Sequence, residues 1–263
     1  LRMLAGARLM PPLGARQCAR RHIPTKLTPA QWGLTALAAA FLAAHYITWI
    51  TSLTGTSTFA SVALVCTQPL FVAFFSYVLF RERTPRRALP GALLALLGAV
   101  TIALSGLSGQ EAQATGQEAL RSNLLALAGA VLMAAHWLAG RQIRQTLAAE
   151  VYTPVLYLIT ALLLALCLPL SGGFRMPLSA LPYMAGLVIG STLLGHAVFA
   201  YALSGVSANV ISFALLGEPV GAMIFSMIFF GEVPTWPVAL GGLLTLMGLA
   251  LYLAFAGGEK QPA

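Results

Sequence analysis

The chain has 263 residues, of which 59% are hydrophobic and only 8% are charged. Soluble domains carry about 25% charged residues, so a soluble fold is excluded and the composition predicts an all-α polytopic membrane protein. The net charge is +8, but we expect the basic residues to orient the protein and to contact anionic lipids at the cytoplasmic face rather than nucleic acid.

Apolar segments long enough to cross a bilayer follow one another along the chain. A transmembrane helix needs about 20 mostly apolar residues. A weak segment, residues 1–16, is interrupted by Arg8 and Pro11. The strong segments are 32–53, 57–80, 88–107, 122–141, 152–170, 181–203, 207–230 and 236–256. The sequence therefore predicts about nine transmembrane helices.

Two of these segments are similar in sequence. Residues 57–82 read STFASVALVCTQPLFVAFFSYVLFRE, and residues 207–232 read SANVISFALLGEPVGAMIFSMIFFGE. Aligning Pro69 with Pro219 gives an offset of 219 − 69 = 150 residues. The same offset pairs Ser57 with Ser207, Gln68 with Glu218, Ser76 with Ser226, Glu82 with Glu232, Gly91 with Gly241 and Gly98 with Gly248. The pattern predicts two repeats, each with a helix broken at its proline at membrane depth.

The repeat sets the predicted domain boundaries. They are a first repeat at 1–107, an external connector at 108–121, a second repeat at 122–256 and a cytoplasmic tail at 257–263. Segment 122–141 finds no counterpart in the first repeat, so we expect two five-helix repeats of which the first is short by its opening helix. Because five is odd, the repeats must cross the membrane in opposite senses, as in inverted-repeat transporters.

The distribution of basic residues predicts the same inversion. Positive charges favour cytoplasmic connectors. Connector 81–87 reads RERTPRR, whereas its repeat equivalent at 231–235 contains no Lys or Arg. The basic connectors 17–31, 81–87 and the one that follows span 122–141, which holds Arg144, fall on one predicted side, and 108–121, 171–180 and 231–235 fall on the other. We therefore expect the first group to be cytoplasmic.

Each repeat has a small-residue start, a proline within the span, a Ser, and an aromatic pair followed by Glu, then a glycine-rich span. This pattern, in residues 57–82 with Gly91 and Gly98 and in residues 207–232 with Gly241 and Gly248, resembles the EamA-type repeat of the drug/metabolite transporter superfamily. The resemblance implies ten helices in two inverted bundles around a central cavity that passes small metabolites. Relative to that pattern, this sequence lacks the first helix.

Glu218 is the acidic residue nearest the centre of a predicted span. A charge there costs on the order of 3 kcal/mol, so such residues usually face a cavity. The adjacent Pro219 removes a backbone hydrogen bond, as Pro69 does beside the equivalent Gln68. We expect Glu218 to bind a proton or a cationic substrate group and Gln68 to contact the substrate. The alternative is that both side chains stabilise the helix breaks by hydrogen bonding.

Histidines and aromatic residues inside the spans are further candidates for lining the cavity. His45 and Trp49 are four residues apart and share one helix face. The other candidates are His136, Trp137, His196 and Tyr201. Aromatic residues in membrane helices more often serve packing, which is the alternative for this set.

Motifs for enzymatic chemistry are weak. The three cysteines have no metal-binding or redox spacing, and no nucleotide motif is present, so we expect no metal, no cofactor and no enzyme. Residues 106–109, GLSG, match an intramembrane serine protease motif at Ser108, but at a helix end far in depth from the histidines.

The sequence thus predicts a secondary transporter of small organic metabolites, such as amino acids or related compounds, in a bacterial inner membrane. We expect export by alternating access, with proton coupling as one option and a homodimer as one assembly. The alternatives are a non-transporting receptor or lipid-handling module and, least favoured, the serine protease.

Overall fold

The computed structural model describes residues 27–81, 84–105, 116–145, 147, 149–167, 178, 181–182 and 217–256. The described residues are helical and contain no strand. Among the described residues, five helical stretches are long and apolar enough to cross a membrane: Pro29–Ser52, Thr58–Phe80, Arg86–Ser105, Gln117–Arg144 and Trp236–Phe255. The protein is therefore a multi-pass membrane protein built from helices, as the composition predicted.

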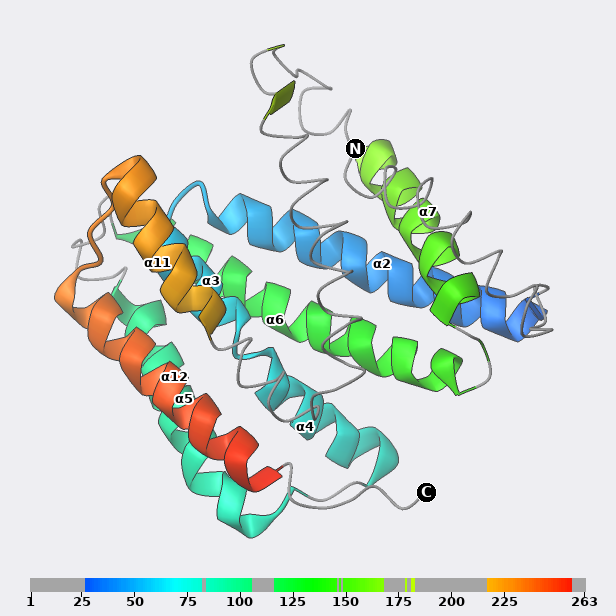
Figure 1. Cartoon of the computed structure of the whole chain (residues 1–263), viewed down its shortest axis with the longest axis horizontal. Helices are drawn as coiled ribbons and strands as arrows, with labels where there is room; N and C mark the ends of the chain where they lie inside the picture. Colours follow the sequence, from blue (N-terminus) through cyan, green and yellow to red (C-terminus); the bar gives the residue numbers. More distant parts are fainter. Residues whose placement is uncertain are drawn as a thin grey trace. The chain divides into compact units, whose positions relative to one another are not determined.

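The helices follow the predicted order (Figure 1). They are α2 (Pro29–Ser52), α3 (Thr58–Val65), α4 (Gln68–Phe80), the 3-10 turn η1 (Arg86–Ala88), α5 (Leu89–Ser105), α6 (Gln117–Arg144), α7 (Ala149–Cys167), α11 (Gly217–Phe230) and α12 (Trp236–Ala256). The predicted spans at 1–16 and, except for Leu181 and Pro182, at 181–203 lie outside the described residues.

Predicted span 57–80 is divided into α3 and α4. The chain leaves α3 after Val65 and begins α4 at Gln68, with Pro69 in its first turn. Proline has no N–H to bond the carbonyl four residues earlier, which here is that of Val65, so the ladder stops there. In the second repeat, the described part of the predicted span 207–230 is α11 (Gly217–Phe230), with Pro219 near its first residue, and residues 207–216 lie outside the described residues. A proline is favourable in the first turn of α4 because its fixed φ suits the start of a helix.

Helix α6 is longer than the predicted span 122–141 and includes residues that we expected in connector 108–121. The helix begins at Gln117, directly after Gly116, which has a φ of 60°. Glu118 lies in the first turn, and Arg141 and Arg144 lie in the last turn. These charges have the signs that favour the two ends of a helix dipole, so the polar ends extend the helix beyond its apolar segment.

The chain forms two compact units, and neither coincides with a repeat. Unit 1 contains residues 1–44 and 135–205, and unit 2 contains residues 45–134 and 206–263. Each unit therefore takes segments from both halves of the sequence.

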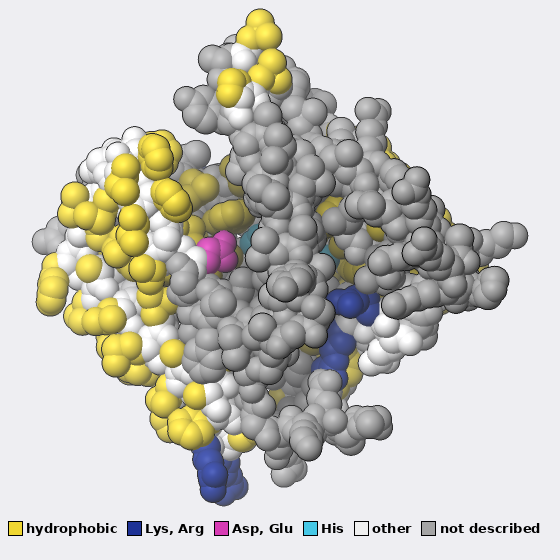
Figure 2. Space-filling view, in the orientation of Figure 1, with side chains coloured by type: hydrophobic (Ala, Val, Ile, Leu, Met, Phe, Trp, Pro, Cys, Tyr) yellow, Lys and Arg dark blue, Asp and Glu magenta, His cyan; other side chains and the backbone are white. Residues whose placement is uncertain are grey.

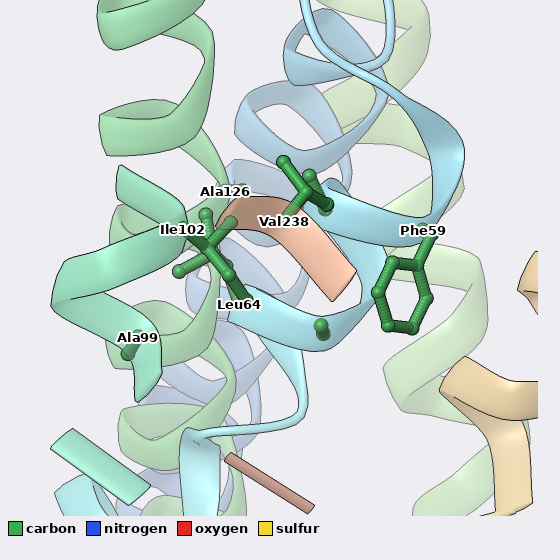
Figure 3. Close-up of a cluster of buried hydrophobic side chains, with 8 residues drawn as sticks. Phe59, Leu64, Ala99, Ile102, Ala126 and Val238 are labelled. Atoms are coloured by element: carbon green, nitrogen blue, oxygen red, sulfur yellow. The ribbon is translucent and has the colours of Figure 1, made fainter. Parts of the chain in front are cut away.

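In unit 2, α5 packs against α12, and α3 packs against α11 and α12. Helices α5 and α12 lie side by side (Figure 1). One core cluster joins α3, α5, α6 and α12 (Figure 3) and contains Phe59, Ala60, Ala63, Leu64, Ala99, Ile102, Ala126 and Val238. Four of these eight residues are alanines. Lipid is as apolar as the helices, so small residues that permit close backbone packing stabilise the contacts.

In unit 1, the described core comes from α2, the second half of α6, and α7. Its buried members include Ala38, Leu42, Leu138, Ile143, Tyr152 and Leu156. The Tyr152 ring lies over Gly140, where a Cβ would be 3.0 Å from the Tyr152 hydroxyl. The glycine thus makes room for the ring of the following helix.

Candidate functional site

Helices α3 and α11 run antiparallel within unit 2. The backbone N–H of Thr58, the first residue of α3, donates to Oε2 of Glu232 at 3.0 Å, and Glu232 lies two residues beyond Phe230, the last residue of α11. At the other end, Cys66 follows α3 and interacts electrostatically with Glu218, the second residue of α11. Because α3 and α11 come from equivalent segments of the two repeats, their opposite directions agree with the predicted inversion.

Glu218 lies in the first turn of α11, next to the end of α3. Its side chain is exposed on the protein, while that of Pro219 is buried. Most of the large side chains of α11 that follow are exposed and hydrophobic, such as Ile224, Phe225 and Phe229. Figure 2 shows hydrophobic side chains covering the face formed by α11 and α12. Glu218 is thus a carboxyl group in the first described turn of an otherwise apolar helix.

Gln68 is the first residue of α4, and its side chain is half-buried. Its amide oxygen Oε1 is buried and has no hydrogen-bond partner among the described residues. A buried acceptor without a partner costs about 1–3 kcal/mol, so a donor from elsewhere would stabilise it. Gln68 is two residues from Cys66, the residue that interacts with Glu218. The two helix starts therefore bring an amide and a carboxylate to the same part of unit 2.

His45 is buried within unit 2, with 2% of its surface exposed. Its Nδ1 lies 2.9 Å from the carbonyl oxygen of Gly129 on α6. A carbonyl oxygen only accepts, so Nδ1 carries the proton in this bond. The ring stacks on Trp49, with centroids 5.7 Å apart and planes at 23°. The imidazole of His45 thus joins α2 to the backbone of α6.

Trp49 is half-buried on the same helix. Its indole Nε1 is buried without a hydrogen-bond partner among the described residues. Ser52 Oγ donates to the Trp49 carbonyl oxygen at 2.6 Å and lies 2.7 Å from Ser61 Oγ on α3. The end of α2 that carries Trp49 is therefore bonded to α3.

Two more candidates lie on α6 in unit 1. His136 Nδ1 lies 2.9 Å from the carbonyl oxygen of Ala38 on α2, so this imidazole also bonds a neighbouring backbone. Trp137 is 43% exposed. His196, Tyr201 and Ser108 lie outside the described residues. Within the described part of the chain, no three His, Cys or acidic residues form a group that could hold a metal ion.

Glu232 lies at the start of α3, a role that was not predicted from the sequence. A signal was present, because Glu82 and Glu232 are paired by the offset of 150 residues. That pairing does not identify Thr58 as the partner of Glu232, because the two residues are 174 residues apart in the chain.

Apolar helices long enough to span a membrane and the antiparallel packing of equivalent segments define a multi-pass protein with an inverted repeat, a design found in transporters. A family model described as the EamA-like transporter family matches residues 1–104 and 120–254. The chain therefore belongs to the EamA-like transporter family, of the drug/metabolite transporter type.

Comparison with solved structures gives a further match. A chain described as "Crystal structure of protein" is similar with a TM-score of 0.61 and 19% sequence identity, over 98% of this chain and 88% of that chain. At that identity the similarity concerns the fold alone. The comparison with curated proteins found no match.

Proposed function

We propose that this protein is a secondary active transporter that exports small organic metabolites, amino acids or related compounds, from bacterial cells across the inner membrane. The observation that carries the proposal is the position of Glu218, an acidic residue in the first turn of an apolar helix and beside the break in α3–α4. Membership of a transporter family supports the same function. Ionisable residues within membrane spans commonly lie on substrate or proton pathways.

In this proposal, Glu218 binds a proton or the cationic group of the substrate, and Gln68 accepts a hydrogen bond from the substrate. The buried Oε1 of Gln68, without a partner among the described residues, supports the second role. Trp49, whose Nε1 is buried without a hydrogen-bond partner in the described part of the chain, is a third candidate contact. We assign His45 and His136 to helix packing, because the Nδ1 of each bonds a backbone carbonyl. Alternating access would then involve movement of the compact units rather than of the two repeats.

Transport in proteoliposomes tests this function. A panel of amino acids and related metabolites is loaded on one side, and flux is measured with and without a pH gradient. We expect flux of at least one compound, and Glu218→Gln should abolish its dependence on pH. Glu118→Gln, in the first turn of α6, is the matched control and should leave the pH dependence intact. Unchanged pH dependence in Glu218→Gln would remove the proton role, and no flux for any compound would count against the transporter proposal.

The sequence repeat allows a second test, which asks whether the carboxyl group of Glu218 can act from the equivalent position in the first repeat. Gln68 and Glu218 are equivalent by the offset of 150 residues, so the double variant Gln68→Glu/Glu218→Gln moves the carboxyl group to the other broken helix. If the two positions face one cavity, the double variant should recover part of the flux that Glu218→Gln loses. Recovery no greater than that of Gln68→Ala/Glu218→Gln would place the two positions in separate surroundings.

We further propose that the basic connector before α5 contacts anionic lipid at the cytoplasmic face. Arg81, Arg86 and Arg87 are exposed, and each basic residue near an anionic surface contributes about 1 kcal/mol. Removing Arg86 and Arg87 should reduce the thermal stabilisation that anionic lipid gives over neutral lipid. An equal effect of anionic lipid on the wild type and on this variant would contradict the contact.

A further inference from the structure

Glu232 bonds the start of a helix that belongs to the other repeat. Its Oε2 accepts from the Thr58 N–H at 3.0 Å, and Ser57 Oγ accepts from the Ala60 N–H at 3.2 Å. The first N–H groups of a helix have no partner within the helix, so side-chain acceptors stabilise them. A carboxylate also has the charge that favours a helix N-terminus. The start of α3 thus has one acceptor from its own repeat and one from the second repeat.

The opposite end of the same helix reaches the proposed binding site. Helix α3 has eight residues, from Thr58 to Val65, and Cys66 follows directly. Six of these eight side chains are buried. The Cys66 N–H donates to the Val62 carbonyl oxygen, so Cys66 is bonded to α3 and we expect a shift at Thr58 to be carried to it. At that end Cys66 interacts with Glu218 of α11.

We propose that Glu232 is a positioning residue that joins the end of α11 to the start of α3 and thereby fixes the α3–α4 break beside Glu218. Its relevance to transport rests on the function proposed above, but the positioning itself does not. The bond joins equivalent segments of the two repeats, and both lie in unit 2. Glu232 is therefore one of the contacts that join both repeats into one unit.

Two native cysteines report on this role without a known substrate. Cys66 lies at the end of α3 whose position is in question, and Cys167 lies on α7 in unit 1; both are half-buried free thiols. The rate at which a maleimide alkylates each thiol in the folded, detergent-solubilised protein is followed by mass spectrometry. A local shift of α3 raises the Cys66 rate alone, whereas general unfolding raises both rates.

The N–H of Thr58 can be removed as selectively as the Glu232 carboxylate that accepts from it. Thr58 is the first residue of α3, where proline is well tolerated, and Ser57 has φ −65° and ψ 148°, a conformation that a following proline accepts. Thr58→Pro deletes the N–H that donates to Glu232. Val233→Ala, at the exposed residue next to Glu232, is the matched control.

Loss of one helix-capping hydrogen bond changes the equilibrium between the packed and the locally opened start of α3 about fivefold. Glu232→Ala should raise the Cys66 rate about fivefold and leave the Cys167 rate unchanged. Glu232→Gln, which keeps an acceptor oxygen, should restore most of the protection. Thr58→Pro should reproduce the effect of Glu232→Ala, and the double variant should react no faster than either single variant because both remove one bond.

Three results would overturn the proposal. They are a Cys66 rate in Glu232→Ala equal to that of Val233→Ala, a parallel rise at Cys167, and additive effects of Thr58→Pro and Glu232→Ala. If Glu232→Ala does not fold, Thr58→Pro with Glu232→Gln carries the same comparison. Since none of these measurements uses transport, they can fail while the transport proposal stands, and the reverse also holds.

Discussion

Gly91 and Gly248 face each other across the contact between α5 and α12. A Cβ on Gly91 would lie 2.7 Å from the Gly248 carbonyl oxygen, and a Cβ on Gly248 would lie 2.7 Å from the Gly91 carbonyl oxygen. Gly98 and Gly241 approach in the same reciprocal way, at 2.5 and 2.8 Å. Gly91 is the repeat equivalent of Gly241, and Gly98 that of Gly248, so the contact has the internal two-fold relationship that an inverted repeat requires.

We predict that Gly91→Ala destabilises the protein by about 1–3 kcal/mol, because the new methyl group meets backbone atoms of α12 that cannot rotate away. The check is the thermal unfolding midpoint in detergent. Gly33→Ala is the control, since a Cβ there has nothing within 4 Å, and it should be neutral or slightly stabilising. Equal midpoints for the two variants would mean that α5 and α12 are not in close contact.

His45 should contribute to stability through its bond to Gly129. His45→Ala removes the bond and the ring stacked on Trp49, so we expect a loss of about 2 kcal/mol or more in the free energy of unfolding. His45→Asn retains a donor near the position of Nδ1 and should recover part of the loss. The exposed Ile50→Ala on the same helix is the control. A stable His45→Ala protein with altered flux would instead assign His45 to the transport site.

The Ser52–Ser61 pair should respond asymmetrically to substitution. Ser52 donates to the Trp49 carbonyl, so in the hydroxyl pair Ser61 is the donor. Ser52→Ala removes the acceptor of a buried donor and should cost about 1–3 kcal/mol. Ser61→Ala leaves Ser52 bonded to Trp49 and should cost less. Unfolding midpoints of both variants and of the double variant decide this, and a larger effect of Ser61→Ala would reverse the assigned donor.

The connectors at the two ends of unit 2 should be labelled from opposite sides of the membrane. In a background with the native cysteines replaced by serine, V233C should react with an impermeant maleimide in intact cells. R86C should react only after the membrane is opened. Both positions are exposed on the protein, so access to the reagent decides the result. Labelling of both from the same side would contradict the inverted arrangement.

The repeat and its inversion could be predicted because they depend on local signals. The prediction of a helix break at Pro69 is confirmed, because α4 begins at Gln68, whereas the break predicted at Pro219 stays a prediction because the residues just before Gly217 lie outside the described part of the chain. The contrast between connectors 81–87 and 231–235 predicted the opposite directions that the α3–α11 and α5–α12 contacts now confirm. Family membership is confirmed by the match over both segments.

Contacts between distant segments could not be predicted. Nothing near His45 in the sequence indicates that its partner is the carbonyl of Gly129, because every backbone carbonyl offers the same chemistry. The two compact units could not be predicted from the repeats either, because the packing of α5 on α12 joins segments from both repeats. The roles proposed for Gln68 and Glu218 stay predictions for the same reason, because they depend on what the side chains meet in a working transporter.

The glycine contact has a consequence for biosynthesis. Helix α5 leaves the ribosome well before α12, and until α12 arrives, the surface of α5 that carries Gly91 and Gly98 lacks its neighbour. The membrane insertion machinery must therefore hold an unfinished bundle while more than half of the chain is still being translated. Premature termination before Trp236 should leave a product that cellular proteases recognise and remove.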